Sequence, residues 1–116
     1  MSRERAEKFG RIAEARAALW LNLHGWWVLA SRVRTPRGEI DLIARRWRTV
    51  AFIEVKARKS AADLDQAIDE YRMQRVAAAV EAVAHRYLRS GDTARIDVLL
   101  LAPRRFPRHI VNAWQP

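Results

Sequence analysis

Two acidic residues and a lysine in the middle of the chain have the types and spacing of a metal-dependent hydrolytic site. Asp41 lies in the segment GEIDLIARR, and Glu54 and Lys56 follow in the segment TVAFIEVKAR. Both segments alternate as β-strands do, so Glu54 and Lys56 share one strand face and Asp41 can approach from the adjacent strand. Carboxylate oxygens suit Mg²⁺ or Mn²⁺, and Mg²⁺ is usually held by only one or two of them. Lys56 would then stabilise charge on a phosphoryl oxygen, or help to position or deprotonate an attacking water.

A structural role explains the same pattern without catalysis. A carboxylate and a lysine two positions apart on a strand can pair, and short motifs of this kind occur by chance. Both faces of TVAFIEVKAR begin apolar, so this strand is expected to be covered on both sides, where an unpaired charge is costly. The residues alone therefore leave a catalytic site and a buried ion pair as alternatives.

The composition describes one basic domain that spans residues 1–116. Half of the residues are hydrophobic and the formal net charge is +9, which is enough apolar material for one core and enough positive charge to attract a polyanion. Cysteine is absent, which excludes disulfides and thiolate metal sites. The first ten residues are charged and no long apolar run follows, so we expect no signal peptide, no membrane span and a cytoplasmic location.

Arginine supplies most of the excess charge, and its planar fork suits phosphate. Trp47 and Phe106 each lie inside an arginine cluster, where an aromatic ring can stack on an exposed base or simply anchor packing. A generally basic surface explains each cluster equally well. The candidate nucleic-acid-binding residues from these clusters are Arg45, Arg46, Arg48, Arg104 and Arg105.

The elements that must position these residues follow from hydrophobic periodicity. Residues 3–24 predict a helix whose apolar stripe contains Phe9, Ile12, Leu19, Trp20 and Leu23. Three sequential strands should follow as a meander in the segments WWVLASRVR, GEIDLIARR and TVAFIEVKAR, in which Ile40, Leu42 and Ala44 share one face of the second strand and Glu39, Asp41 and Ile43 share the other.

The second half of the chain predicts a crossover. A long helix from about Leu64 to Leu88, capped by Ser60 or Asp63, should lead to the strand ARIDVLLLAP, which lies parallel to TVAFIEVKAR, and HIVNAW can add an edge strand. Arg72 interrupts the apolar stripe of this helix, so it either extends past the rim of the core or points at the carboxylates. The fold class is thus α/β, with a mixed sheet of about five strands flanked by helices.

Several segments resemble the YraN family of small bacterial proteins, which is similar to archaeal Holliday-junction resolvases and has the restriction-endonuclease-like fold of the PD-(D/E)xK superfamily. The resemblance covers nearly the whole chain. It rests on GRIAEARAALWLNLHGW, GEIDLIA, FIEVKAR, a basic residue in the long helix, RIDVLLL and HIVNAW.

The resemblance implies specific roles for individual residues. Asp41 and Glu54 become the metal ligands and Lys56 the catalytic lysine. Glu14 becomes an additional catalytic acid, although it lies away from the apolar stripe of its helix, alongside Gly10, Ala18 and Leu21. Arg72 stands where the family usually has lysine, which argues against a second base there and leaves phosphate binding intact. Glu39 is expected to be peripheral and Asp97 structural, and the histidines are not expected to bind metal.

Three functions follow as hypotheses. The first is a Mg²⁺- or Mn²⁺-dependent nuclease acting on DNA, with branched or damaged structures as candidate substrates. A homodimer is part of this hypothesis, because resolvase-like folds often pair. The second is a non-catalytic nucleic-acid-binding module that retains the nuclease fold. The third is an adaptor that docks on a partner protein through exposed aromatics such as Trp47 or Trp114.

Overall fold

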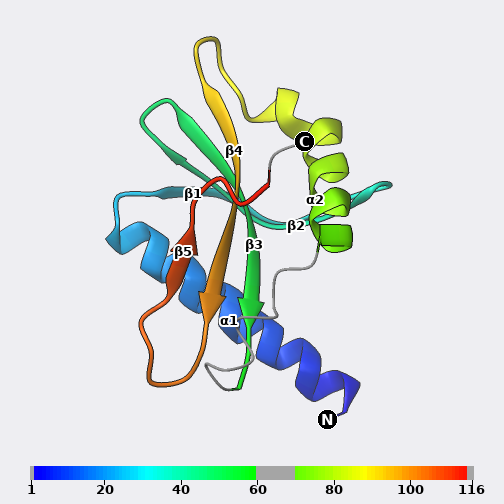
Figure 1. Ribbon diagram of the computed structural model, residues 1–116, viewed down its shortest axis with the longest axis vertical. Coiled ribbons are helices and arrows are strands. Elements are labelled where there is room, and N and C mark those ends of the chain that lie inside the picture. Colours follow the sequence, from blue (N-terminus) through cyan, green and yellow to red (C-terminus); the bar gives the residue numbers. More distant parts are fainter. Residues whose placement is uncertain (1, 60–69, 115–116) are drawn as a thin grey trace.

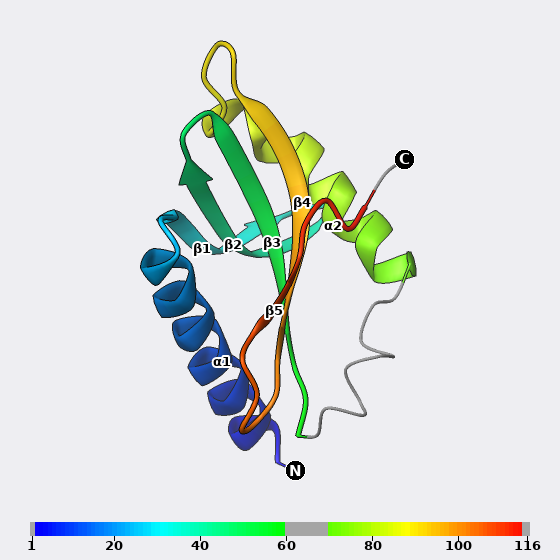
Figure 2. The same cartoon turned by 60° about the vertical axis from the view of Figure 1, so that its left-hand side comes forward.

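In the part of the chain that the structure describes, a five-stranded mixed sheet has one α-helix on each face. The computed structural model describes residues 2–59 and 70–114. The elements are α1 (Arg3–Leu23), β1 (Trp27–Thr35), β2 (Gly38–Arg46), β3 (Thr49–Ala57), α2 (Glu70–Val83), the 3₁₀ turn η2 (Ala84–Arg86), β4 (Thr93–Leu101) and β5 (Arg108–Ile110). Figures 1 and 2 show α1 and α2 on opposite sides of the sheet.

The strands lie in the order β1-β2-β3-β4-β5. Strands β1, β2 and β3 form the predicted antiparallel meander, and β4 lies parallel to β3 as a helical crossover requires. Strand β5 pairs antiparallel with β4. The α/β class and the mixed five-stranded sheet are therefore confirmed, while the edge strand is shorter than the segment HIVNAW.

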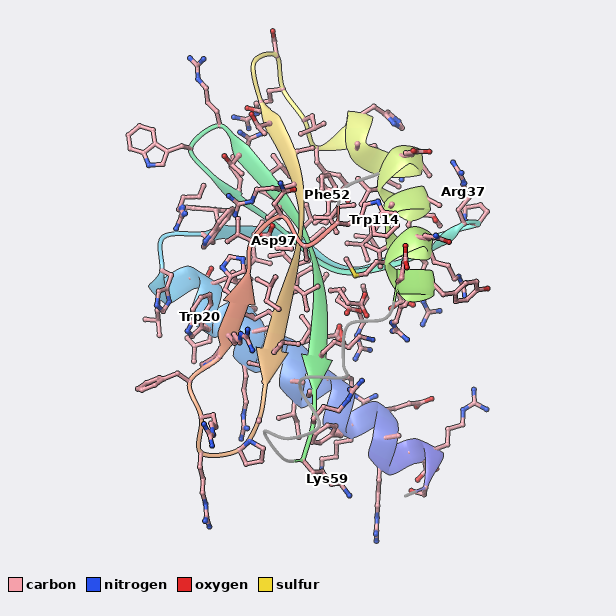
Figure 3. All side chains as sticks on the ribbon, in the orientation of Figure 1. Trp20, Arg37, Phe52, Lys59, Asp97 and Trp114 are labelled. Atoms are coloured by element: carbon pink, nitrogen blue, oxygen red, sulfur yellow. The ribbon has the colours of Figure 1, made fainter. Side chains whose placement is uncertain are left out.

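The core consists of a layer on each face of the sheet. Leu42, Ile53 and Leu99 pack under α1, and the fully buried Phe52, labelled in Figure 3, packs with Val76 and Val80 of α2. Strand β3 contributes to both layers, as its apolar residues on both faces predicted. The start of the long helix and the caps Ser60 and Asp63 lie outside the described residues, and its α-helical part ends at Val83 rather than Leu88.

The predicted apolar stripe of α1 is wrong. The buried residues of this helix are Ala13, Ala17 and Leu21, whereas Leu19 and Leu23 are 60% and 74% exposed. Residues four positions apart lie on one helix face, and the small alanine side chains let that face approach the sheet closely. Counting only bulky apolar residues selected the wrong face, and with it placed Glu14 away from the sheet.

Two further expectations need correction. Trp114 is partly buried against the cluster of Met73, Val98 and Leu100, so it is not an exposed docking aromatic. The strict alternation of the second strand also fails, because Ile40 and Ile43 both pack in the α2-side cluster. The break falls beside Asp41, close to the point where β2 and β3 stop pairing.

Candidate active site

The two predicted metal ligands lie where β2 and β3 separate. The antiparallel pairing of these strands runs from Arg46 with Thr49 to Leu42 with Ile53, and Asp41 and Glu54 are the next residue on each strand. Beyond that point the carboxylate Oδ2 of Asp41 accepts the backbone N–H of Val55 at 2.8 Å. The side chain thus replaces a strand as the hydrogen-bond partner of β3, which ties Asp41 to the segment that contains Glu54 and Lys56.

Glu54 is buried and held by two cations. Its side chain is 2% exposed, and its Oε1 lies 3.0 Å from Lys56 Nζ and 2.7 Å from Arg72 Nε. Lys56 comes from the same strand face, and Arg72 comes from the first turns of α2. Of the two orientations open for Arg72, the structure has the one directed at the carboxylates.

Glu14 reaches the same region from α1. It lies on the sheet-facing side of the helix, next to the buried Ala13 and Ala17, and its side chain is 17% exposed. Arg32 Nε lies 3.0 and 3.1 Å from the two carboxylate oxygens of Glu14. Sequence reasoning missed Arg32, because its only distinguishing feature is a left-handed backbone with φ of 50° within β1, which the sequence does not reveal.

These side chains surround an open cleft of about 330 Å³ between α1, the sheet and α2. Gly10 lies at its edge, and a Cβ added there would meet nothing within 4 Å, so the cleft is open on the α1 side. The residues that line it are Ala6, Phe9, Gly10, Ala13, Glu14, Asp41, Val55, Lys56, Ala57, Arg58 and Arg72. The structure therefore brings Glu14, Asp41, Lys56 and Arg72 to one cleft, with Glu54 bound to two of them.

Burial and negative charge act together on Asp41. Removal of its carboxylate from water, and then repulsion from Glu54, raise the pKa of Asp41 to about 7, although the hydrogen bond from Val55 opposes the rise. The charge of Glu14 raises the pKa further and that of Arg72 lowers it. Near neutral pH this carboxyl group therefore holds a proton for part of the time, and an added cation would compete with that proton.

The donor set fits a hard divalent cation held largely by water. Asp41 and Glu54 offer carboxylate oxygens, and repulsion between them favours an intervening positive charge. Within residues 2–59 and 70–114, no group of three or more acidic, histidine or cysteine side chains is close enough to hold a metal. Mg²⁺ usually needs only one or two carboxylates, so the two ligands are sufficient, while Glu14 stays with Arg32 rather than joining them.

The predicted phosphate-binding arginines differ in their availability. The guanidinium of Arg45 pairs with Asp92 and also donates to the carbonyl of Tyr87, which leaves little of it for phosphate. Arg46 lies over the ring of Trp26 at 4.4 Å. Arg48, Arg104 and Arg105 are exposed.

The remaining polar candidates form structural contacts. Asp97, labelled in Figure 3, is fully buried and accepts hydrogen bonds from Arg95 and the backbone of Asn112, and it lies 2.7 Å from His109 Nε2. These contacts join β4 to the C-terminal segment, as expected of a structural acid. Glu39 is half exposed, 3.7 Å from Arg34, outside the cleft.

Comparison with known proteins identifies the family. The model of "Uncharacterised protein family UPF0102" matches residues 13–101. The chain belongs to the UPF0102 (YraN) family. UPF0102 proteins of Erythrobacter litoralis and Sphingopyxis alaskensis are 65% and 64% identical to it over 116 residues, which is 100% of both chains in each case. A UPF0102 protein of Paramagnetospirillum magneticum is 44% identical and covers 95% of this chain and 89% of its own.

A solved structure supports the fold. Hjc, a Holliday junction resolvase from Archaeoglobus fulgidus, matches with a TM-score of 0.55 and 22% identity, over 84% of this chain and 72% of its own. The chain therefore has the same fold as this resolvase. No helix in the part of the chain that the structure describes is long and apolar enough to cross a membrane.

Proposed function

We propose that this protein is a metal-dependent nuclease that cleaves DNA through Asp41, Glu54 and Lys56. One observation carries the proposal: the two acids occupy the point where β2 and β3 separate, and Lys56 opens onto the same cleft as Asp41. Residues that form only an ion pair would not need a cleft or a neighbouring acid whose pKa is raised to about 7.

Each side chain has a distinct role in this proposal. Asp41 and Glu54 hold Mg²⁺ or Mn²⁺, which when bound polarises the phosphodiester and acidifies a water. Lys56 Nζ stabilises the negative charge that develops on the phosphoryl oxygens. Arg72, whose side chain is 57% exposed beside Glu54, binds a flanking phosphate. A carboxylate oxygen of Glu14 accepts a hydrogen bond from the attacking water and so orients it.

The proposed substrate is branched or damaged DNA in the cytoplasm. The fold resembles that of a Holliday junction resolvase, and a net charge of +9 favours a polyanion. A homodimer would suit a symmetric junction, and the size of the protein in solution would test it.

Cleavage assays test the proposal directly. The wild type should cut at least one of single-stranded, duplex, flapped and four-way DNA with Mg²⁺ or Mn²⁺, and it should cut none of them with a chelator. Asp41→Asn and Lys56→Met should each lower the rate by at least about 100-fold, because the transition state loses a metal ligand or a charge partner. Glu81→Gln is the matched control, since that acid is exposed on α2 and, among the described residues, its ion-pair partner is Arg37.

A non-catalytic nucleic-acid-binding module is the second candidate. The observation that favours it is the contact of both Lys56 and Arg72 with the same oxygen of Glu54, because a carboxylate neutralised in this way has less need of a metal. This module would bind DNA with a steep salt dependence and cut it with neither metal. Equal cleavage by wild type, Asp41→Asn and Lys56→Met would reject the nuclease proposal.

A further inference from the structure

Trp47 lies at the tip of the turn between β2 and β3 and is 91% exposed. Arg46 pairs with Thr49, so Trp47 and Arg48 alone form this turn. The cleft does not use Trp47, and no core cluster of the described residues contains it. The indole therefore presents a large apolar surface to solvent without a packing role.

The backbone conformation of Trp47 is one that tryptophan rarely adopts. Its φ is 57°, in the left-handed region where glycine or asparagine is favoured and a bulky side chain is rare. Such a conformation costs on the order of 1 kcal/mol or more and persists only where the surroundings impose it. A tryptophan at this position lowers the stability of the fold, so its presence points to a use for the exposed ring.

The turn is held rigidly beneath the exposed ring. The carbonyl of Trp47 accepts a hydrogen bond from Arg45 at 3.1 Å, and Arg45 is in turn fixed by its ion pair with Asp92. The carbonyl of Arg48 accepts the N–H of Thr93 at 2.7 Å. Both carbonyls of the two-residue turn are thus anchored, so the indole can bind a flat partner with little loss of backbone entropy.

The surroundings of the ring are positively charged. Arg46, Arg89 and the exposed Trp27 line a shallow groove of about 390 Å³ together with Trp47. Arg48 is the other residue of the turn and is exposed, and neither Arg46 nor Arg48 forms an ion pair with any residue that the structure describes. Asp92 is the nearby acid, and Arg45 neutralises it. An aromatic ring among cations fits a nucleobase attached to a phosphate backbone better than an apolar protein surface.

The turn lies at a defined distance from the cleft. Five residue steps along β3 separate Thr49 from Glu54, which corresponds to roughly 17 Å at about 3.3 Å per residue. That distance is about half a turn of B-form DNA, since one turn is about 34 Å. The turn and the loop before β4 lie together at one end of the molecule in both views (Figures 1 and 2), so DNA in the cleft can reach them.

We propose that Trp47 stacks on an unpaired base of DNA while Arg46 and Arg48 bind the adjacent phosphates. This inference rests on the proposed function for the identity of the polymer, and it adds a specific substrate feature. DNA with a bulged, flapped or junction base is bound in preference to a continuous duplex, because only an unstacked base offers its face to the indole.

The test measures binding without cleavage. A short fluorescein-labelled duplex and the same duplex with one unpaired adenine are titrated with protein in a chelating buffer, and anisotropy gives each Kd. Trp47→Gly should weaken binding to the bulged probe by about 5- to 150-fold, the range that corresponds to the loss of one base stack, and should leave the duplex Kd unchanged. Trp47→Phe should restore most of the preference.

Controls separate stacking from misfolding and from charge. Glycine tolerates the left-handed turn, so Trp47→Gly should match or exceed the wild type in thermal stability. Phe106→Ala is the matched control, because Phe106 is 96% exposed in the other arginine-rich loop, and it should bind both probes as the wild type does. Arg48→Gln should lower the salt dependence of binding to both probes by about one unit of slope, whereas Trp47→Gly should not change it.

Three results would overturn the inference. They are an equal preference for the bulged probe in wild type and Trp47→Gly, no binding of either probe, or a change of oligomeric state in Trp47→Gly with unchanged DNA binding, which would assign the ring to a protein contact. None of these readouts depends on cleavage, so the nuclease proposal stands or falls separately with Asp41→Asn and Lys56→Met.

Discussion

At the scale of single residues, Asp41 has two conflicting requirements in the cleft. It must be ionised to hold a metal, yet burial and Glu54 favour its protonated form and raise its pKa to about 7. Asp41 lies beside β3 through the hydrogen bond from Val55, although the alternation of β2 breaks at that point. The alternation of β3 was sufficient to predict that Glu54 and Lys56 share one strand face. It could not predict the contact of Glu14 with Arg32, because that contact depends on how closely α1 approaches β1.

The raised pKa predicts how stability depends on pH. The folded chain binds the Asp41 proton more tightly than the unfolded chain, so this contribution is complete below about pH 4 and is lost as the pH rises to about 7. In a chelating buffer, the change amounts to at most about 4 kcal/mol. Asp41→Asn stays neutral and can still accept the N–H of Val55, so its stability should not fall in this range.

Urea denaturation at several pH values between 4 and 8 measures the difference. Glu81→Gln is the control, because it removes an exposed carboxyl group in place of the buried one. Its free energy of unfolding should fall with rising pH as that of the wild type does. A parallel decline of wild type and Asp41→Asn would show that another group titrates. Added Mg²⁺ should stabilise the wild type most above pH 7, where the ligand no longer has to release a proton.

Substitution of Arg32 should change the pKa of the neighbouring Asp41 rather than the fold. Its guanidinium neutralises Glu14 and also attracts Asp41, so Arg32→Met should raise the pKa of Asp41 further and Arg32→Lys should partly restore it. Carbon NMR of the labelled aspartate carboxyl group reports that pKa directly. Arg34→Met, which removes an exposed arginine beside Glu39, should leave it unchanged, and an unchanged pKa in Arg32→Met would contradict the role.

At the scale of elements, the sheet was predictable and the face of α1 was not. Strand periodicity, short turns and a crossover of helical length are local signals, and each predicted strand is present. The face of a helix that packs depends on side-chain size as well as hydrophobicity. Alanines at positions 13 and 17 carry little hydrophobic signal, yet they define the buried face because larger side chains would hold the helix away from β3.

Replacement by alanine should have opposite effects on stability at two glycines, Gly38 and Gly10. A Cβ at Gly38, where β2 begins, would lie 2.9 Å from the backbone oxygen of Arg75 in α2, whereas a Cβ at Gly10 in α1 meets nothing. Gly38→Ala should therefore destabilise the protein by about 1–3 kcal/mol, because the strand and helix must move apart. Gly10→Ala should stabilise it by about 0.5–1 kcal/mol. Thermal unfolding of both variants checks the pair, and equal effects would refute this packing of α2 on β2.

At the scale of the whole molecule, the basic residues are distributed to both ends of the sheet. Arg48 lies at the turn before β3, and Arg105 lies in the loop after β4, at the opposite end of Figure 1. Composition predicted the attraction for a polyanion but not this separation, nor that Arg45 would be occupied by Asp92.

This distribution predicts how DNA affinity responds to salt. Arg48→Gln and Arg105→Gln should each reduce the slope of log K against log salt by about one, and together by about two, because distant sites act independently. Arg45→Met should instead lower thermal stability, since the carboxylate of Asp92 loses its ion pair and keeps only the hydrogen bond from the backbone of Arg89 among the described residues. Anisotropy titrations at several salt concentrations, with a melting curve for each variant, separate the two classes. A full loss of binding from either surface variant alone would contradict a distributed interface.

The buried face of α1 that contains Ala13 and Ala17 has a consequence for mutational scans of this family. Uncharged residues in that helix set the separation between Glu14 and the other carboxylates of the candidate site, so a substitution such as Ala17→Leu would alter that site without touching any ionisable group. A survey that replaces only polar positions would miss it. Tolerance at positions 13 and 17 should follow side-chain volume, with serine accepted and leucine rejected.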